Sequence, residues 1–306
     1  MDQRSSKIKI EKGGESPFSF SSSDLIQSIQ IETPSALKKV SSPIKWAGGK
    51  RWLLPKLLQI FPTEFDWYIE PFAGGASAFF GLAPSRAILA DLNPDLITTY
   101  GAIRDEPNNV WLKLSEHARR HSDTYFYEVR SSKPRLPASI AARFLYLNRT
   151  CWNGLFRVNQ RGEFNVPRGT KNAVLLPTDN PPLLSKTLKN TELIWSDFEM
   201  PIDCAGRGDL VYVDPPYTVK HNFNGFVKYN EFIFSWSDQE RLARSLRRAR
   251  KRGAFVVVSN ADHPSVRSLY EPDFVVEQVA RNSVLSGDAD FRCLTSELLI
   301  IGSSHG

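Results

Sequence analysis

The chain has 306 residues, of which 41% are hydrophobic and 24% charged, and its formal net charge is +6. This composition fits a globular protein with one large domain or one domain with an insertion, and the positive charge favours a polyanionic partner. Three separated cysteines without a C-x-x-C support neither a zinc site nor a disulfide framework, and they fit a reduced cytosolic setting. Because there is no apolar run of about 18 residues and no N-terminal apolar core with a cleavage site, we expect neither a membrane span nor secretion.

Residues 1–42 are polar and rich in serine, which predicts a mostly disordered N-terminal tail with a short helix at 24–29. Residues 44–50, Ile-Lys-Trp-Ala-Gly-Gly-Lys, precede a predicted helix with four leucines on one face: Leu53, Leu54, Leu57 and Leu58. The stretch is not a P-loop, because Arg51 follows the lysine and no glycine stands five residues before it. Spacing alone leaves open whether 44–50 is a binding loop or only a glycine turn before an amphipathic helix.

Two strands with polar ends are predicted next. Residues 67–75, Trp-Tyr-Ile-Glu-Pro-Phe-Ala-Gly-Gly, indicate a strand, a glycine pair and a helix start, which bring backbone close to a nucleotide-like ligand. Residues 87–90 predict a second strand that leads to Asp91, where an acid can hold both hydroxyls of a ribose. The full G-x-G-x-x-G dinucleotide fingerprint is absent. Asn93 and Pro94 form an N-cap and first-turn pair for a helix that runs to about Arg104.

Residues 105–185 combine many cations with interleaved aromatic rings. The cations are Arg119, Arg120, Arg130, Lys133, Arg135, Arg143, Arg149, Arg157, Arg161, Arg168 and Lys171, and the rings are Tyr125, Phe126, Tyr127, Trp152, Phe156 and Phe164. This mixture suits nucleic acid, with cations for the phosphates and rings for base stacking. A solvated charged face explains any single arginine, but it explains the dense run at 148–169 less well. We therefore predict a mostly helical insertion between two halves of a sheet domain.

The sheet domain is predicted to resume at 191–198, with a buried strand at 254–259 and two last strands, at 274–276 and 296–301, that are antiparallel at one edge. Before the last strands, Ser237 and Glu240 fit a capping box for a helix that buries Leu242 and Leu246 and ends at Gly253. That helix carries a row of cations, which fit DNA contacts or a solvated outer face equally well: Arg241, Arg244, Arg247, Arg248, Arg250 and Lys251.

The most informative stretch is 210–217, Leu-Val-Tyr-Val-Asp-Pro-Pro-Tyr. The first four residues predict a strand buried on both faces of a parallel sheet, and the prolines, which lack an N–H, end it at Asp214. Open α/β sheets bind ligands at this end of their strands. The side chain of Asp214 and the carbonyl of Pro215 can accept hydrogen bonds from the exocyclic amine of a base, and Tyr217 offers a ring for stacking. The plain alternative is a strand that merely ends in an acid–proline turn.

Five motifs occur in a fixed order: 45–50 (Lys-Trp-Ala-Gly-Gly-Lys), 70–75 (Glu-Pro-Phe-Ala-Gly-Gly), 147–159, 162–167 (Gly-Glu-Phe-Asn-Val-Pro) and 214–217 (Asp-Pro-Pro-Tyr). Together they make residues 43–301 resemble the Dam-type DNA adenine-N6 methyltransferases, and their order matches the alpha group of that family. The resemblance implies an α/β fold with a Rossmann-like, doubly wound methyltransferase sheet and a mostly helical inserted target-recognition domain. It divides the chain into a tail at 1–42, a catalytic domain at 43–104 and 186–306, and a recognition insert at 105–185.

By this resemblance the methyl donor is S-adenosylmethionine, and no metal is involved. The residues implied for catalysis are Asp214, Pro215, Pro216 and Tyr217. Those implied for the cofactor are Trp46 and Lys50 at its methionine end, Phe72, Ala73 and Gly74 beside the donor, Asp91 at the ribose, Asp197 and Phe198 at the adenine, and Asp214. Those implied for DNA are Lys45, Trp152, Asn153, Leu155, Arg157 and Pro167. Of these, Trp152 and Asn153 enter the duplex beside the extruded adenine; Trp152 replaces the tyrosine usual in close relatives but keeps the ability to stack.

We expect a site-specific enzyme that methylates adenine N6 in duplex DNA, within GATC, with base flipping, as in restriction–modification systems. One alternative is a methyltransferase for an RNA adenine or a protein amide, and the basic aromatic insert argues against the amide. The other is a DNA-binding regulator without catalysis, and the intact 214–217 motif argues against it. The resemblance further implies a monomer, with a dimer on DNA as the alternative. It places the protein at the nucleoid in the cytoplasm of a bacterial, archaeal or phage-infected cell.

Overall fold

The structure is a computed structural model that describes residues 40–159, 161–219, 234–282 and 294–303. The predicted tail up to residue 39, with its short helix, lies outside these ranges. The helices are α1 (Leu54–Ile60), α2 (Ser77–Leu82), α3 (Pro94–Asp105), α4 (Pro107–Arg120), α5 (Asp123–Ser131), α6 (Pro137–Thr150), the 3-10 turn η2 (Trp152–Gly154), α7 (Pro181–Leu188), α8 (Glu199–Cys204), α10 (Trp236–Lys251) and α11 (Pro264–Tyr270). The strands are β1 (Tyr68–Glu70), β2 (Ala87–Asp91), β3 (Thr191–Trp195), β4 (Leu210–Val213), β5 (Phe255–Ala261), β6 (Val275–Asn282) and β7 (Leu294–Gly302).

The strands form one sheet in the order β3-β2-β1-β4-β5-β7-β6. The first five pair in parallel, and β7 pairs antiparallel with both β5 and β6. This confirms the α/β class and the antiparallel last strands at one edge. From β1 the chain winds outward through β2 and β3, whereas from β4 it winds the other way to β5. The order therefore reverses between β1 and β4, and a crevice for a ligand is expected beyond the carboxyl ends of these two strands.

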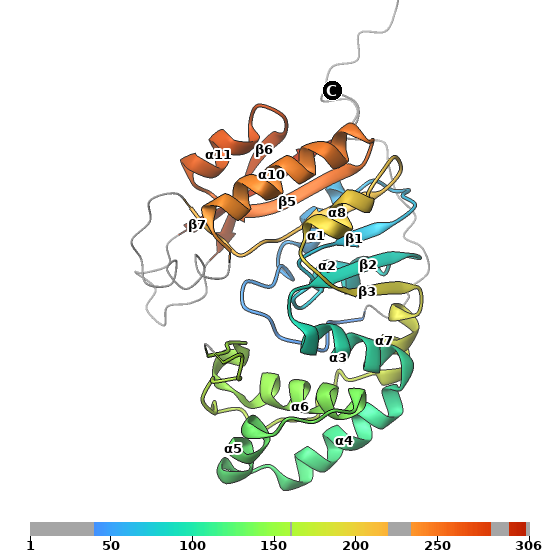
Figure 1. Cartoon of the computed structure of the whole chain (residues 1–306), viewed down its shortest axis with the longest axis vertical. Helices are drawn as coiled ribbons and strands as arrows, with labels where there is room; N and C mark the ends of the chain where they lie inside the picture. The colour runs from blue at the N-terminus through green and yellow to red at the C-terminus, as the bar shows by residue number, and fades with distance from the viewer. Residues whose placement is uncertain (1–39, 160, 220–233, 283–293, 304–306) are drawn as a thin grey trace, which may run out of the picture. The chain divides into compact units, whose positions relative to one another are not determined.

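Helices cover both faces of the sheet, as the sequence of β4 requires. Val211 and Val213 join a buried cluster with residues of α8, α10 and α11, while Leu210 and Tyr212 join a cluster with residues of α1 to α6. All four residues of β4 are buried, because alternate side chains of a strand point to opposite faces and both faces are packed. Figure 1 shows α8 and α10 together over one face of the sheet. This is the doubly wound arrangement that the sequence indicated.

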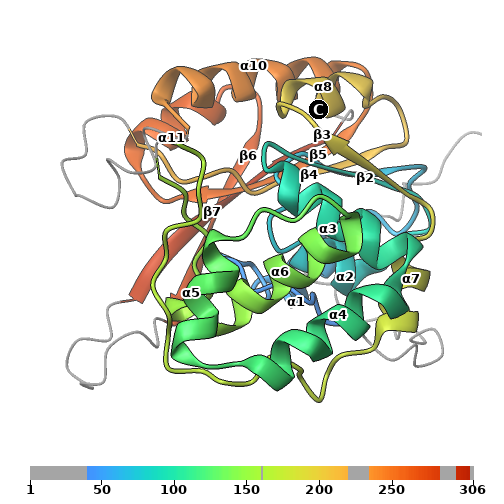
Figure 2. The same cartoon turned by 60° about the horizontal axis from the view of Figure 1, so that its bottom comes forward.

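The segment between β2 and β3 is mostly helical. In Figure 2, α4, α5 and α6 lie side by side, and α6 packs on both α3 and α4. The centre of this group is apolar, because α6 buries most of its residues from Ala138 onward. Asn148 joins the carboxyl end of α6 to the stretch before α1. Its side chain accepts a hydrogen bond from the Lys45 amide at 2.9 Å and donates one to the Lys45 carbonyl at 2.7 Å. The boundaries given above for the insert remain a prediction.

Two helix starts follow from local side chains. The predicted cap of α3 is confirmed, since the side chain of Asn93 accepts hydrogen bonds from the amides of Asp95 and Leu96. The predicted capping box of α10 is wrong by two residues. Its N-cap is Ser235, which accepts from the Asp238 amide while the Asp238 carboxylate accepts from the Ser235 amide. Both serines fit the motif, but only Ser235 completes the reciprocal pair.

The predicted apolar face of α1 is partly wrong. Leu53 and Leu57 are buried and Leu54 is partly buried, but Leu58, one position after Leu57 on the helix Leu54–Ile60, is 37% exposed.

Candidate active site

A cavity of about 1650 Å³ opens at the reversal point of the sheet. It brings together the residues predicted for the cofactor and for catalysis: Trp46, Lys50, Phe72, Ala73, Gly74, Asp91, Asp197, Phe198, Asp214, Pro215, Pro216 and Tyr217. These residues come from the ends of β1, β2, β3 and β4 and from the loop before α1, which parallel pairing places at one edge. The same cavity reaches Leu155 and Arg157 in the segment after α6.

Asp214 lies at the end of β4 and is held from one side. Its Oδ1 accepts a hydrogen bond from the Ser259 hydroxyl at 2.8 Å and lies 3.1 Å from Nζ of Lys50. Burial raises the pKa of Asp214 above its ordinary value, while the Lys50 ammonium opposes that rise and favours the ionised carboxylate. Within the described ranges these contacts all fall on Oδ1, so Oδ2 is left for a hydrogen-bond donor in the cavity.

Lys50 lies between three oxygens. Its ammonium donates to the Gly48 carbonyl at 2.8 Å, and it lies 3.1 Å from Asp214 Oδ1 and 3.6 Å from Glu297 Oε2. It also lies 4.5 Å from the centre of the Tyr217 ring, and only 4% of its side chain is exposed. The buried ammonium is therefore paired with two carboxylates at the Asp214 end of the cavity.

Glu297 is a residue of this site that sequence reasoning missed. It belongs to β7, where it is buried, and its carboxylate accepts a hydrogen bond from the Tyr217 hydroxyl at 2.7 Å. Glu297 thus holds the ring that lies beside Lys50. The available signal was an acid directly before the apolar run 298–301, since a charge in a buried strand needs a partner.

The glycine turn after β1 is fixed by its neighbours. Gly74 has a φ of +43°, and a Cβ there would lie 2.8 Å from two atoms of the Trp46 ring, so this position requires glycine. The Gly74 carbonyl accepts from the Tyr100 hydroxyl at 2.7 Å, and its amide donates to Asp91 Oδ2 at 3.0 Å. Asp91 Oδ1 accepts from the Asn93 amide at 2.9 Å. Asp91 therefore also shapes the loop that the cavity exposes.

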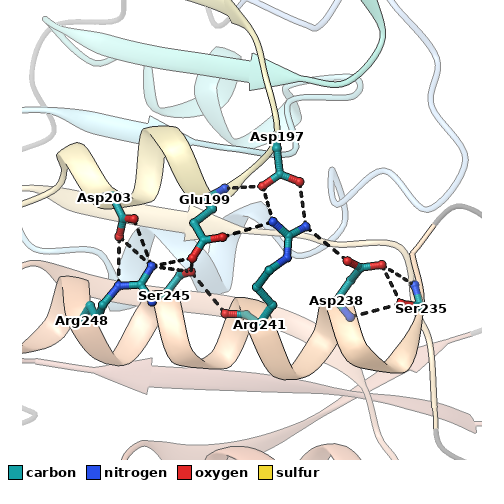
Figure 3. A network of polar contacts seen from close by, with 8 residues as sticks. All are labelled: Asp197, Glu199, Asp203, Ser235, Asp238, Arg241, Ser245 and Arg248. Carbon is teal, nitrogen blue, oxygen red and sulfur yellow. Dashed lines mark hydrogen bonds and ion pairs between the residues drawn. The ribbon is translucent and has the colours of Figure 1, made fainter.

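Asp197 and Phe198 follow β3 and face α10. The carboxylate of Asp197 is paired with the guanidinium of Arg241, as Figure 3 shows. The ring of Phe198 stacks on Phe72, with 5.3 Å between the centres and 22° between the planes, and Phe234 meets both rings edge-on. Arg241 is a second residue that sequence reasoning did not place in the cavity, because nothing in a row of six cations singles it out.

Four of the predicted DNA residues lie outside the cavity but next to one another. Trp152, Asn153 and Gly154 form the turn η2, in which Asn153 has a φ of +53° and Trp152 is 51% exposed. The Trp152 amide donates to the Pro167 carbonyl at 2.9 Å, and a Cβ on Gly154 would lie 3.1 Å from Cβ of Lys45. The stretch before α1 and the segment after α6 therefore form one continuous surface beside the cavity.

Several cations of the insert and of α10 serve the fold. Arg149 is buried and binds both oxygens of Asp179 at 2.7 Å, so the interpretation of this arginine as a phosphate contact is wrong. On α10, Arg241 and Arg248 pair with acids at or near α8, and Arg247 pairs with Asp273. These three therefore form ion pairs within the protein, while Arg248 remains 43% exposed, and both interpretations of the row stay predictions.

Comparison with known proteins decides the family. Residues 46–284 match the model of the D12 class of N6 adenine-specific DNA methyltransferases. The chain belongs to this family. One relative of this D12 methyltransferase is the type II methyltransferase M1.LlaDCHI of Lactococcus lactis, which is 34% identical over 84% of this chain and 93% of its own. Another is the type II methyltransferase M.MjaIII of Methanocaldococcus jannaschii, 31% identical over 81% of this chain and 94% of its own.

A third relative is the DNA adenine methylase of Escherichia coli K12, which is 31% identical over 87% of this chain and 96% of its own. The D12 chain is thus an adenine-specific DNA methyltransferase. Within the ranges that the structure describes, none of its helices combines the length and the apolar composition of a membrane span.

Proposed function

We propose that this D12 enzyme binds S-adenosylmethionine and an adenine extruded from duplex DNA in the cavity at β1 and β4, and that it methylates N6 within GATC. The observation that carries the proposal is the single cavity that Asp91, Asp214 and Arg157 share. A donor site, an acceptor of amine protons and a cation suited to reading a base edge are needed together for this reaction, and no one of them suffices.

The residues of the cavity fit the donor. The backbone of Gly74 lines the cavity, Asp91 supplies carboxylate oxygens beside it, and Phe72, stacked on the buried Phe198, provides apolar ring surface for a purine. Trp46 packs on Gly74 on one side and stacks on Phe156 on the other, with 5.7 Å between the ring centres, so the loop before α1 is held against the insert. When bound, S-adenosylmethionine would supply the electrophilic methyl group, and its sulfur would keep the electrons of the broken C–S bond and leave as the thioether S-adenosylhomocysteine.

The residues at the end of β4 act on the target amine. One N–H of the amine donates to Asp214 Oδ2 and the other to the Pro215 carbonyl, which localises the nitrogen lone pair and stabilises the positive charge that develops as the N–C bond forms. Burial makes Asp214 a better proton acceptor, so it can take the proton that the methylated nitrogen releases. Tyr217 stacks on the extruded base and offsets part of the few kcal/mol that leaving the helix costs.

Asp91→Ala is expected to weaken S-adenosylmethionine binding about ten- to a hundredfold, because it removes a charged acceptor worth about 1.5–3 kcal/mol and also releases the Gly74 amide. DNA affinity should stay within about twofold. Titration calorimetry measures both constants. Glu192→Ala, an exposed acid on the neighbouring β3, is the control and should change neither. Unaltered cofactor affinity in Asp91→Ala would move the ribose site elsewhere.

Arg157→Ala is expected to relax target choice at one base pair. Arg157 is exposed, and Asn165 orients it by accepting from Nε at 2.8 Å and, through its carbonyl, from Nη2 at 3.5 Å. The remaining N–H groups of Nη1 and Nη2 are left to donate to a guanine edge. Loss of such a bidentate contact costs about 1–3 kcal/mol on GATC and less on duplexes already changed at that position. Leu155, beside it, is suited to a thymine methyl.

The assay compares methylation rates on GATC and on duplexes that differ by one base pair. The control is Arg161→Ala, an exposed arginine of the same loop. This variant should slow methylation of all duplexes alike. It should also reduce by about one the slope of the logarithm of the DNA-binding constant against the logarithm of the salt concentration. A uniform loss in Arg157→Ala would show that this arginine, too, contacts only the backbone.

A further inference from the structure

Arg241 contacts both residues that the cofactor site needs after β3. Its Nη1 donates to Asp197 Oδ1 and its Nη2 to Asp197 Oδ2, each at 2.8 Å, in the bidentate geometry that fits a guanidinium to a carboxylate. The central carbon of the same guanidinium, Cζ, lies 4.2 Å from the centre of the Phe198 ring. One side chain of α10 therefore fixes the direction of Asp197 and covers a face of Phe198.

The guanidinium is itself held in place. It lies 3.2 Å from Glu199 Oε2 at the start of α8 and 3.2 Å from Asp238 Oδ1 in the first turn of α10. Asp238 is tied to Ser235 by the capping box, as Figure 3 shows. Arg241 thus joins three carboxylates, from the loop after β3, from α8 and from α10, which would repel one another without it.

The contact between Asp197 and Arg241 uses both carboxylate oxygens, and the Glu199 amide also donates to Oδ1 at 3.0 Å. The Asp197 side chain is therefore fixed in direction, and the buried Phe198 ring, in contact with both Arg241 and Phe72, supports the wall on which a purine would lie. Arg241, Asp197 and Phe198 line the same cavity as Asp91, so the position of the ring decides the shape of that part of the wall.

We propose that Arg241 is a positioning residue for the cofactor, which acts by fixing Asp197 and Phe198 where the adenine of S-adenosylmethionine binds. This inference rests on the proposed cofactor site. Without the guanidinium, repulsion among Asp197, Glu199 and Asp238 releases the loop after β3, and the Phe198 ring loses its cover. The DNA surface and the Asp214 end of the cavity do not depend on this contact.

The chain offers a matched control two turns further along α10. Arg248 also joins α10 to α8, with Nη2 at 2.7 Å from Glu199 Oε1 and 3.0 Å from Asp203 Oδ1. Among the described residues its contacts do not include Asp197 or Phe198, and it is not one of the residues that line the cavity. Arg241→Gln and Arg248→Gln therefore each remove ion pairs between α8 and its surroundings, but only the first acts on the cavity wall.

The experiment measures S-adenosylmethionine binding by calorimetry, together with DNA affinity, kcat and melting temperature, for wild type and both variants. Arg241→Gln is expected to raise the Kd and KM for S-adenosylmethionine about tenfold, with kcat at saturating donor and DNA affinity within about twofold. Both variants should lower the melting temperature by similar amounts, because each removes ion pairs to α8. Arg248→Gln should leave the Kd and KM for S-adenosylmethionine unchanged. Arg241→Lys should be intermediate, because an ammonium cannot bind both oxygens of Asp197 in parallel.

A double-mutant cycle with Asp197→Asn tests the route of the effect. If Arg241 acts through Asp197, the double variant Asp197→Asn/Arg241→Gln should bind the donor no more weakly than the single variant with the higher Kd. Fully additive losses, or equal donor constants in Arg241→Gln and wild type, would overturn the inference. Donor binding by the wild type, measured in the same way, tests the proposed function separately. If the wild type binds the donor and Arg241→Gln binds it equally well, only the role of Arg241 is contradicted.

Discussion

Asp214→Ala is expected to lower kcat for methyl transfer about a hundredfold or more, because it removes one of two acceptors that polarise the target amine. The loss is compounded by Lys50, whose ammonium lies 3.1 Å from the carboxylate in the wild type and would face the developing cation without it. Asp214→Asn should fail to a similar degree, since an amide has the same shape but no charge. The fold should survive both changes, because β4 is held by its buried residues.

The rate is measured under single turnover with labelled donor, alongside donor and DNA affinities and circular dichroism. Ser259→Ala is the graded comparison: it removes only the hydroxyl that donates to Oδ1 and should therefore slow the reaction much less. Turnover near the wild-type rate in either Asp214 variant would remove this residue from the mechanism.

Arg149→Met should lower the free energy of unfolding by about 3–5 kcal/mol, because it breaks a buried ion pair and leaves a carboxylate unpaired. Only 1% of the arginine side chain and 10% of the Asp179 side chain are exposed. The guanidinium also donates to the Val174 carbonyl at 2.7 Å and lies within 3.4 Å of the Pro43 carbonyl, so it joins the loop before α1 to the end of the insert. Its loss removes contacts to three residues at once, namely Pro43, Val174 and Asp179.

Urea unfolding followed by fluorescence measures this change. Lys56→Met is the matched control, since Lys56 pairs with Glu277 at 3.5 Å while both side chains are more than two-fifths exposed, at 44% and 43%. It should stay within about 0.5 kcal/mol of wild type. A loss of the same size in both variants would show that burial of the Arg149 pair adds nothing to its importance.

Local chemistry made much of the fold predictable. The prolines after Asp214 end β4 where the sequence indicates, because proline has a fixed φ and no N–H wherever it stands in a chain. Asn93 with Pro94 begins α3, because the asparagine side chain caps the first amides of the helix that follows it. The apolar run of β4 likewise requires two covered faces, which fixes the class of the fold. Ser235 and Ser237 both fit the capping motif of α10, and the sequence alone could not decide between them. The N-cap is the earlier one, Ser235.

Pairing between distant residues was not predictable. Arg149 and Arg157 look alike in the sequence, yet one is buried against Asp179 and the other is exposed beside the cavity. Glu297 meets Tyr217 across 80 residues, and Arg241 meets Asp197 across 44. Periodicity indicates which face of an element is apolar, but the acid that each cation finds depends on how the sheet and helices pack.

Identification of the methylated base tests the central claim most directly. Duplex DNA that contains GATC and control sites is incubated with the purified full chain and labelled S-adenosylmethionine, then digested to nucleosides and, in parallel, sequenced for modified bases. We predict label in N6-methyladenine, confined to GATC and absent with Asp214→Ala. Label in a different nucleoside, or none from folded wild-type protein that binds DNA, would contradict the account.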